Sequence, residues 1–232
     1  MYVLIGGGDI RAKETIEIDK QIAKLAKEKA ERERGEGARA NALFVGTASH
    51  DYMPYNNSFH KMYTGELGLK TDVVLTVYTQ MDEEKIKGKF EKADMIYVGG
   101  GDTVFLIEEW RRAGLDERIA EARARGVIVA GLSAGAICWF EKMYTDSAKT
   151  GEDVYTVVPG LGVLPGAACP HYNHRRADFA EVIGEGEDWT CMEDNSALIL
   201  DDDGKILRAL NLGGQVYKVR KENGKIIETP IR

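Results

Sequence analysis

Residues 127–140 read VIVAGLSAGAICWF and join an apolar, β-branched run to a turn made of small residues. The run at 127–130 predicts a buried strand, and the segment from Ala134 onward suits a helix. Between them, GLSAG at 131–135 matches G-x-S-x-G, the pattern of a nucleophile elbow on a sharp strand-to-helix turn. Small flanking residues fit this interpretation, because strand and helix pass close together beside a strained backbone. Ser133 is therefore the candidate nucleophile. The alternative is a close-packed turn whose serine has no chemical role.

The rest of the chain alternates apolar runs with helical patterns. Continuous apolar runs are typical of parallel strands covered on both faces, and the alternation predicts an α/β fold, a doubly wound three-layer sandwich. The other predicted strands of this sandwich lie at 2–5, 42–45, 73–78 and 95–98. The predicted helices lie at 14–34, 53–67, 104–112 and 117–125. Short antiparallel strands are predicted toward the C-terminus, at 197–200, 206–210, 215–220 and 225–228. No linker is visible, so we expect a single domain, 1–232.

Composition narrows the classes of function. The chain has 232 residues and a formal net charge of −7, which disfavours nucleic acid as a partner. No segment has the length and apolar character of a membrane helix or a signal peptide, and the three cysteines form no CxxC pair. We therefore expect a cytoplasmic protein that binds no membrane. We expect no cofactor, since GGGDIR at 6–11 departs from G-x-G-x-x-G, and no metal, since no ligand cluster has the required spacing.

Three glycine-rich turns follow predicted strands, at 6–8, at 99–101 and around Ser133. Ligands of open α/β sheets bind beyond the carboxyl ends of the strands, so we expect these turns to gather at one edge. An acyl-transfer site also needs two N–H donors for the oxyanion. The backbone of Ala134 would supply one donor, and the turn at 99–101 the other.

The serine needs a base, and the base needs an acceptor that fixes its tautomer. His171 is the preferred base, because it stands in a loop after a proline. The other histidines are His50, His60 and His174. The carboxylates between Ser133 and His171 that could orient the base are Glu141, Asp146, Glu152 and Asp153. Asp146 is preferred for its polar loop, with Glu141 left open.

The elbow, the segment GGGDT at 99–103 and the segment PHY at 170–172 together resemble peptidase family S51, which includes aspartyl dipeptidase and cyanophycinase. The resemblance implies a flavodoxin-like fold akin to the class I glutamine amidotransferases. It also implies Ser133 as nucleophile, His171 as base and Gly101 as an oxyanion donor. The resemblance implies that the third residue of the catalytic triad is an Asp or Glu in the loop after the elbow helix, and Asp146 is the nearest match.

The resemblance further implies a serine-type peptidase that hydrolyses short peptides through an acyl-enzyme. Dipeptides with an N-terminal aspartate are one candidate substrate, with Arg175 and Arg176 as the residues that would bind the acidic side chain. The alternatives are a cyanophycinase-like isoaspartyl peptidase, a small-molecule esterase and a non-catalytic amidotransferase-like binding domain. The sequence leaves the oligomeric state open, with a homodimer as one option.

Overall fold

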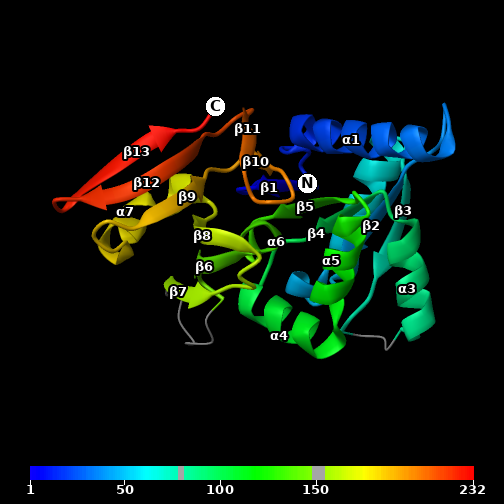
Figure 1. The fold of residues 1–232 in the computed structure, drawn as a ribbon, viewed down its shortest axis with the longest axis horizontal. Helices are drawn as coiled ribbons and strands as arrows, with labels where there is room; N and C mark the ends of the chain where they lie inside the picture. The colour runs from blue at the N-terminus through cyan, green and yellow to red at the C-terminus, as the bar shows by residue number, and fades with distance from the viewer. Residues whose placement is uncertain (78–80, 148–154) are drawn as a thin grey trace.

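The computed structural model describes residues 1–77, 81–147 and 155–232, and within them the main sheet has seven strands (Figure 1). Their order is β11-β10-β1-β5-β4-β2-β3. The five strands from β1 to β3 in that order are parallel, and β10 and β11 extend the sheet in antiparallel pairing. The parallel strands are β1 (Tyr2–Ile5), β2 (Asn41–Val45), β3 (Lys70–Val74), β4 (Met95–Val98) and β5 (Ile128–Leu132). The antiparallel strands are β10 (Ser196–Leu200) and β11 (Ile206–Asn211).

Both faces of this sheet are buried, as the continuous apolar runs predict. Along β1, Tyr2 and Leu4 belong to one hydrophobic core, whereas Val3 and Ile5 belong to the other. Helices cover both faces, which confirms the α/β fold class. The first core is packed by α3 (Glu83–Lys92), α4 (Thr103–Ala113), α5 (Leu115–Ala124) and α6 (Ala134–Ile137). The second core is packed by α1 (Ile16–Arg34), α2 (Met53–His60) and the π-helix η2 (Lys61–Glu66).

A second sheet, which the sequence analysis did not predict, lies beside the first in the described part of the chain (Figure 1). The helix after the elbow ends at Ile137, and the next residues form a strand that starts this sheet. The strand order is β13-β12-β9-β8-β6-β7, with parallel pairing of β6, β8 and β9. The strands are β6 (Phe140–Thr145), β7 (Thr156–Pro159), β8 (Leu164–Cys169), β9 (Asp188–Met192), β12 (Val216–Glu222) and β13 (Lys225–Pro230). The helix α7 (Tyr172–Val182) follows β8.

The C-terminal strands were predicted as antiparallel, and their pairings confirm this. They divide between the sheets, because β10 and β11 join the first sheet while β12 and β13 join the second. The predicted strand at 73–78 begins earlier, at Lys70, and ends at Val74; residue 78 lies outside the described residues. The side chains of β3 are partly exposed, as expected for the edge strand.

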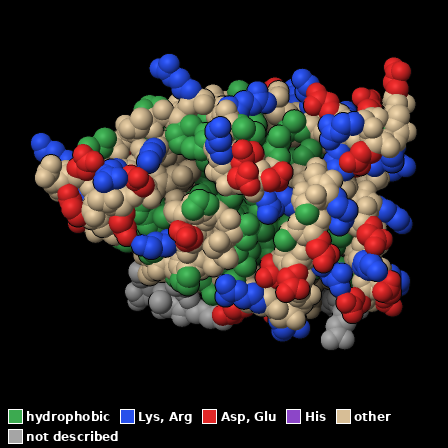
Figure 2. Space-filling view, in the orientation of Figure 1, with side chains coloured by type: hydrophobic (Ala, Val, Ile, Leu, Met, Phe, Trp, Pro, Cys, Tyr) green, Lys and Arg blue, Asp and Glu red, His purple; other side chains and the backbone are tan. Residues whose placement is uncertain are grey.

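Acidic and basic side chains are intermixed over the face drawn in Figure 2. Among the described residues, no helix is both long enough and apolar enough to cross a membrane.

Candidate active site

Ser133 lies in the turn between β5 and α6 with φ 52° and ψ −110°, a backbone conformation that residues other than glycine rarely adopt. The glycines on either side explain why small residues are needed. A Cβ on Gly131 would lie 2.0 Å from the carbonyl oxygen of Gly135, and one on Gly135 would lie 2.2 Å from that of Val98. Close packing of strand and helix therefore holds the serine in its strained position.

The carboxyl end of β1 joins the three loops of the site. The consecutive carbonyl groups of residues 5–7 accept hydrogen bonds from the backbone N–H groups of Ser133, His171 and Asn195, at 2.9, 3.0 and 3.0 Å. Ser133 follows the first sheet's β5, His171 follows β8 of the second sheet, and Asn195 lies in the turn from β9 to β10. The site is thus assembled where the two sheets meet.

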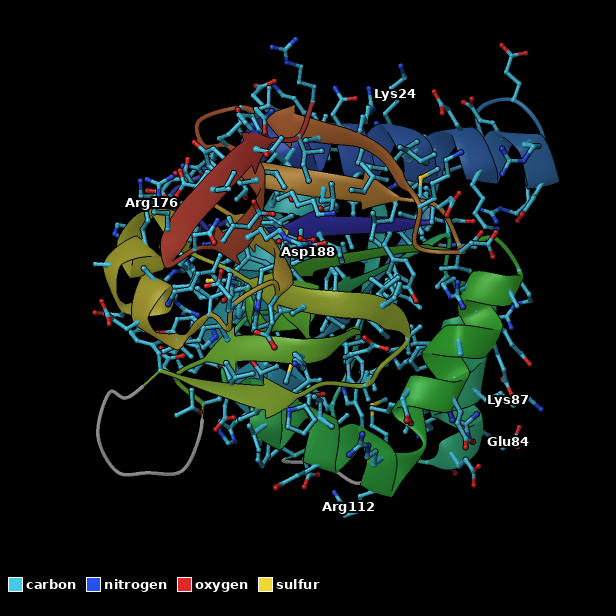
Figure 3. The ribbon with its side chains drawn as sticks, turned by 60° about the vertical axis from the view of Figure 1, so that its left-hand side comes forward. Lys24, Glu84, Lys87, Arg112, Arg176 and Asp188 are labelled. Atoms are coloured by element: carbon cyan, nitrogen blue, oxygen red, sulfur yellow. The ribbon has the colours of Figure 1, made fainter. Side chains whose placement is uncertain are left out.

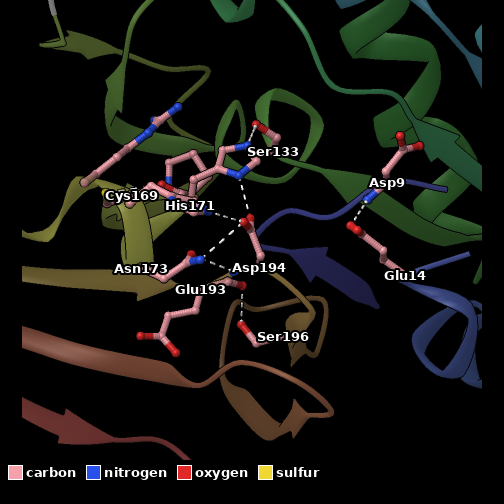
Figure 4. Close-up of polar contacts among 12 residues, drawn as sticks. Asp9, Glu14, Ser133, Cys169, His171, Asn173, Glu193, Asp194 and Ser196 are labelled. Carbon is pink, nitrogen blue, oxygen red and sulfur yellow. Dashed lines mark hydrogen bonds and ion pairs between the residues drawn. The ribbon is translucent and has the colours of Figure 1, made fainter. Parts of the chain in front are cut away.

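Ser133, His171 and Asp194 form one hydrogen-bonded chain (Figure 4). The Oγ of Ser133 is 2.8 Å from Nε2 of His171. The Nδ1 of the same ring is 2.6 Å from Oδ1 of Asp194. With the Nδ1 proton directed to the carboxylate, Nε2 is free to accept the serine proton, which is the tautomer that a general base needs.

Asp194 is held by further polar contacts. Its second oxygen lies 3.3 Å from Nδ2 of Asn173 and 3.0 Å from Nε2 of His174, and its backbone N–H donates to Oδ1 of Asn173. Burial acts to raise the pKa of Asp194, but the hydrogen bonds from His171 and Asn173 outweigh it and bring the pKa below its usual value. The carboxyl is therefore ionised at neutral pH and can support an imidazolium.

Gly7 makes room for this contact. A Cβ at this position would lie 1.8 Å from Oδ1 of Asp194 and 2.3 Å from Nδ1 of His171. The two hydrogen-bonding atoms therefore occupy the space that a side chain at residue 7 would need.

A cavity of about 390 Å³ opens at Ser133 and His171. Gly8, Gly100 and Gly101 also line it, which confirms that the three glycine-rich turns gather at one edge. Within the described part of the chain, the backbone N–H groups of Gly101 and Ala134 donate to no protein acceptor. Both N–H groups are thus available for a ligand oxygen near Ser133.

The structure corrects the choice of Asp146 as the residue that orients His171. The carboxylate of Asp146 lies 3.7 Å from the guanidinium of Arg175 instead. Glu141, the other option, lies on β6 and accepts a hydrogen bond from the backbone N–H of Gly166. The remaining alternatives, Glu152 and Asp153, lie outside the described residues.

Arg175 and Arg176 were expected to bind substrate, but neither lines the cavity at Ser133. Arg175 is buried, donates to the carbonyl oxygen of Tyr144 at 3.1 Å and stacks over Tyr155. Arg176 forms ion pairs with Glu193 and with Glu228 of β13, beside which Figure 3 places it. Their roles in packing explain their position better than substrate binding does.

Asp194 was not among the predicted residues, because it follows His171 in the chain and the candidate carboxylates lie between Ser133 and His171. The available signal was the polar segment Glu193-Asp194-Asn195 between two apolar runs.

Among the histidines, His50 packs against Phe105. Among the described residues, no group of three or more His, Cys, Asp or Glu side chains is arranged to hold a metal ion.

The sequence profile of Peptidase family S51 matches residues 2–208. The chain belongs to this family. An uncharacterized peptidase, YgaJ of Bacillus subtilis, is 31% identical to this S51 chain over 97% of it and 94% of the relative. A protein named Peptidase E, from Streptomyces coelicolor, is 29% identical over 52% of the S51 chain and 50% of its own length.

Two solved structures of similar fold each cover 98% or more of the S51 chain. A peptidase from an acI-B1 Actinobacterium matches with a TM-score of 0.70 and 15% identity, over 98% of this chain and 96% of the other. A putative Peptidase E from Listeria monocytogenes matches with a TM-score of 0.58 and 20% identity, over 100% and 98%. The two likenesses establish a shared fold, and membership of family S51 identifies the chain as a peptidase.

Proposed function

We propose that this S51 peptidase uses serine chemistry, with Ser133 as nucleophile, His171 as general base and Asp194 as the carboxylate that orients it. The observation that carries the proposal is the unbroken chain of contacts, 2.8 and 2.6 Å long, from the serine hydroxyl through the imidazole to Asp194. The three side chains are arranged as a hydrolytic triad, and the serine has the strained backbone of an elbow.

The proposed reaction has two halves. The Oγ of Ser133 attacks the scissile carbonyl carbon while Nε2 of His171 takes the hydroxyl proton, and the resulting oxyanion accepts hydrogen bonds from the backbone of Ala134 and Gly101. His171 then donates its proton to the leaving amine, which leaves an acyl-enzyme on Ser133. Water attacks the ester carbonyl while it transfers a proton to the same nitrogen. His171 then returns this proton to the Oγ of Ser133 as the acyl–oxygen bond breaks, which releases the carboxylate product and restores the free serine. Asp194 stabilises the imidazolium in both halves.

Short peptides are the proposed substrates, and dipeptides with an N-terminal aspartate remain a candidate. The cavity at Ser133 supports small substrates, because its volume of about 390 Å³ is suited to a few residues rather than a folded chain.

The test combines a peptide panel with an active-site probe. Asp-Leu, Ala-Leu, Leu-Leu and β-Asp-Arg are incubated with wild type and Ser133→Ala, and both proteins are treated with a fluorophosphonate that reacts with activated serines. We expect wild type to cleave at least one dipeptide and to be labelled at Ser133. The variant should lose about 10⁴-fold or more in kcat and all labelling.

The two readouts separate the parts of the proposal. Labelling of Ser133 without cleavage of any dipeptide would keep the serine chemistry and overturn the substrate. Equal activity of wild type and Ser133→Ala, with no labelling, would overturn the serine mechanism itself.

A further inference from the structure

Arg11 is the one fully cationic side chain among the described residues lining the cavity at Ser133. Asp9 fixes its guanidinium, since the two oxygens of Asp9 lie 3.2 Å from Nε and 3.1 Å from Nη2. Within the described residues, Nη1 of Arg11 has no hydrogen-bond acceptor. An arginine held by one carboxylate through Nε and Nη2 thus keeps Nη1 available for a second carboxylate.

A second cavity, of about 540 Å³, adjoins the first. The two share Ile10 and Arg11 in their walls. The outer cavity runs along η2, and its other charged or titratable lining residues are Lys13, His60, Lys61 and Glu66. A π-helical turn is a rare geometry that is frequent at functional sites.

Cations outnumber carboxylates in the lining of this outer cavity. Three cations line it, against the single carboxylate of Glu66. Lys13 pairs with Glu66 at 2.6 Å and Arg11 pairs with Asp9, which leaves Lys61 as the unpaired cation of the described lining. Lys61 forms no ion pair with any described residue. Such a site contrasts with the chain's net charge of −7.

We propose that the outer cavity is a subsite for carboxylate groups, so that the enzyme acts on acidic peptides longer than two residues, with Arg11 as the specificity-determining residue between the two cavities. This inference rests on the proposed function for the position of the scissile bond at Ser133. Lys61 would bind a carboxylate farther along the peptide, because it lines only the outer cavity.

The cavity volumes support a substrate of this length. The inner cavity holds the residues next to the scissile bond, and the outer one adds more than the same volume again. The exposed ring of Tyr52 also lines the inner cavity and offers apolar contact for the peptide. A short acidic peptide therefore matches both the space and the charge.

Binding is measured separately from catalysis. Calorimetric titration of Ser133→Ala compares a pentapeptide containing two aspartates with its diasparagine counterpart, at low and high salt. Arg11→Gln and Lys61→Gln are then added to this background. The matched control is Lys87→Gln, which removes the same charge from exposed α3, at a residue lining neither cavity (Figure 3).

We expect the acidic pentapeptide to bind about tenfold more tightly than the amide peptide at low salt, with a smaller preference at high salt. Arg11→Gln should remove most of the preference. Lys61→Gln should weaken binding of the acidic pentapeptide but not of the dipeptide Asp-Leu, and Lys87→Gln should change neither.

Equal affinity for the acidic and amide peptides would overturn the inference, as would an equal loss in Lys87→Gln. Melting curves of each variant establish that it is folded. An acidic preference in Ser133→Ala, together with a wild type that hydrolyses nothing, would retain the subsite and reject the proposed function.

Discussion

At the scale of single residues, the two aspartates Asp194 and Asp146 differ in their contacts. Asp194 accepts a hydrogen bond from His171, and its pKa lies below the usual value despite burial. Asp146 is half exposed and lies near a buried arginine. A carboxylate fixes a histidine tautomer only through direct contact. We therefore expect replacement of Asp194 to impair catalysis and replacement of Asp146 to leave it nearly unchanged.

Replacing Asp194 by asparagine should lower kcat by about 10³- to 10⁴-fold, since the amide can direct its NH₂ group at Nδ1 and favour the wrong tautomer. KM should change little, because Asp194 does not line the cavity at Ser133. Asp146→Asn is the matched control and should retain activity within a few-fold. Steady-state kinetics on whichever dipeptide wild type cleaves measures both. A large loss in Asp146→Asn with an active Asp194→Asn would reverse the assignment.

At the scale of elements, the end of β1 positions the site without supplying any reacting group. The carbonyl groups of its last residue, Ile5, and of the next two residues accept hydrogen bonds from the three loops that carry or flank Ser133, His171 and Asp194. Gly7 lies directly under the contact between His171 and Asp194. Residue 7 therefore has to be glycine, because a Cβ there would overlap the hydrogen-bonding atoms of His171 and Asp194.

Gly7→Ala should abolish most activity, because its methyl group needs the space of the two hydrogen-bonding atoms. We expect a loss in kcat of about 10²-fold or more, as displacing a catalytic group by about 1 Å has effects of that size. Gly88→Ala is the control, since a Cβ there meets nothing within 4 Å and its helical position favours alanine by about 0.5–1 kcal/mol. Kinetics together with thermal melting separates the two effects. Wild-type kcat in folded Gly7→Ala would show that the contact tolerates the displacement.

What could be predicted from the sequence depends on whether a feature is formed by consecutive residues or by long-range pairing. The elbow is a local signal, because strand, turn and helix are consecutive, and Ser133 lies where the pattern placed it. Asp194 depends on long-range pairing, since β9 joins the second sheet while β10 pairs with β1. No local pattern reports that pairing. The position of the Arg175 side chain likewise depends on a long-range contact. Its guanidinium donates to the carbonyl oxygen of Tyr144, which lies 31 positions earlier in the chain, on β6.

At the scale of the whole molecule, buried charge links the fold to pH. Asp19 on α1 is fully buried and accepts hydrogen bonds from Thr15 at 2.8 Å and from Tyr63 on η2 at 2.7 Å. Burial raises the pKa of Asp19 to about 6, although both hydrogen bonds act to lower it. The folded protein therefore binds a proton that the unfolded chain releases near pH 4.

This difference sets the sign of the pH dependence. Between about pH 4 and pH 6 the folded state holds more protons at Asp19 than the unfolded state, so this group's contribution to stability falls as pH rises. With about 1.4 kcal/mol for each pKa unit, and with the unfolded-state carboxyl already partly ionised at pH 4, the contribution at pH 7 is about 2 kcal/mol less favourable than at pH 4. Asp19→Asn does not titrate. The free energy of unfolding of Asp19→Asn minus that of wild type should therefore increase by about that amount between pH 4 and pH 7, so the variant gains stability relative to wild type.

Urea unfolding of wild type, Asp19→Asn and the control Asp203→Asn at several pH values measures this change. Asp203 is exposed and its carboxylate has no partner among the described residues, so its replacement removes the same charge without disturbing a buried contact. Comparing slopes removes any constant cost of replacing the carboxylate, because such a cost is the same at pH 4 and pH 7. A difference between Asp19→Asn and wild type that stays constant with pH would show that Asp19 ionises alike in both states. In that case its hydrogen bonds with Thr15 and Tyr63 would fully offset its burial.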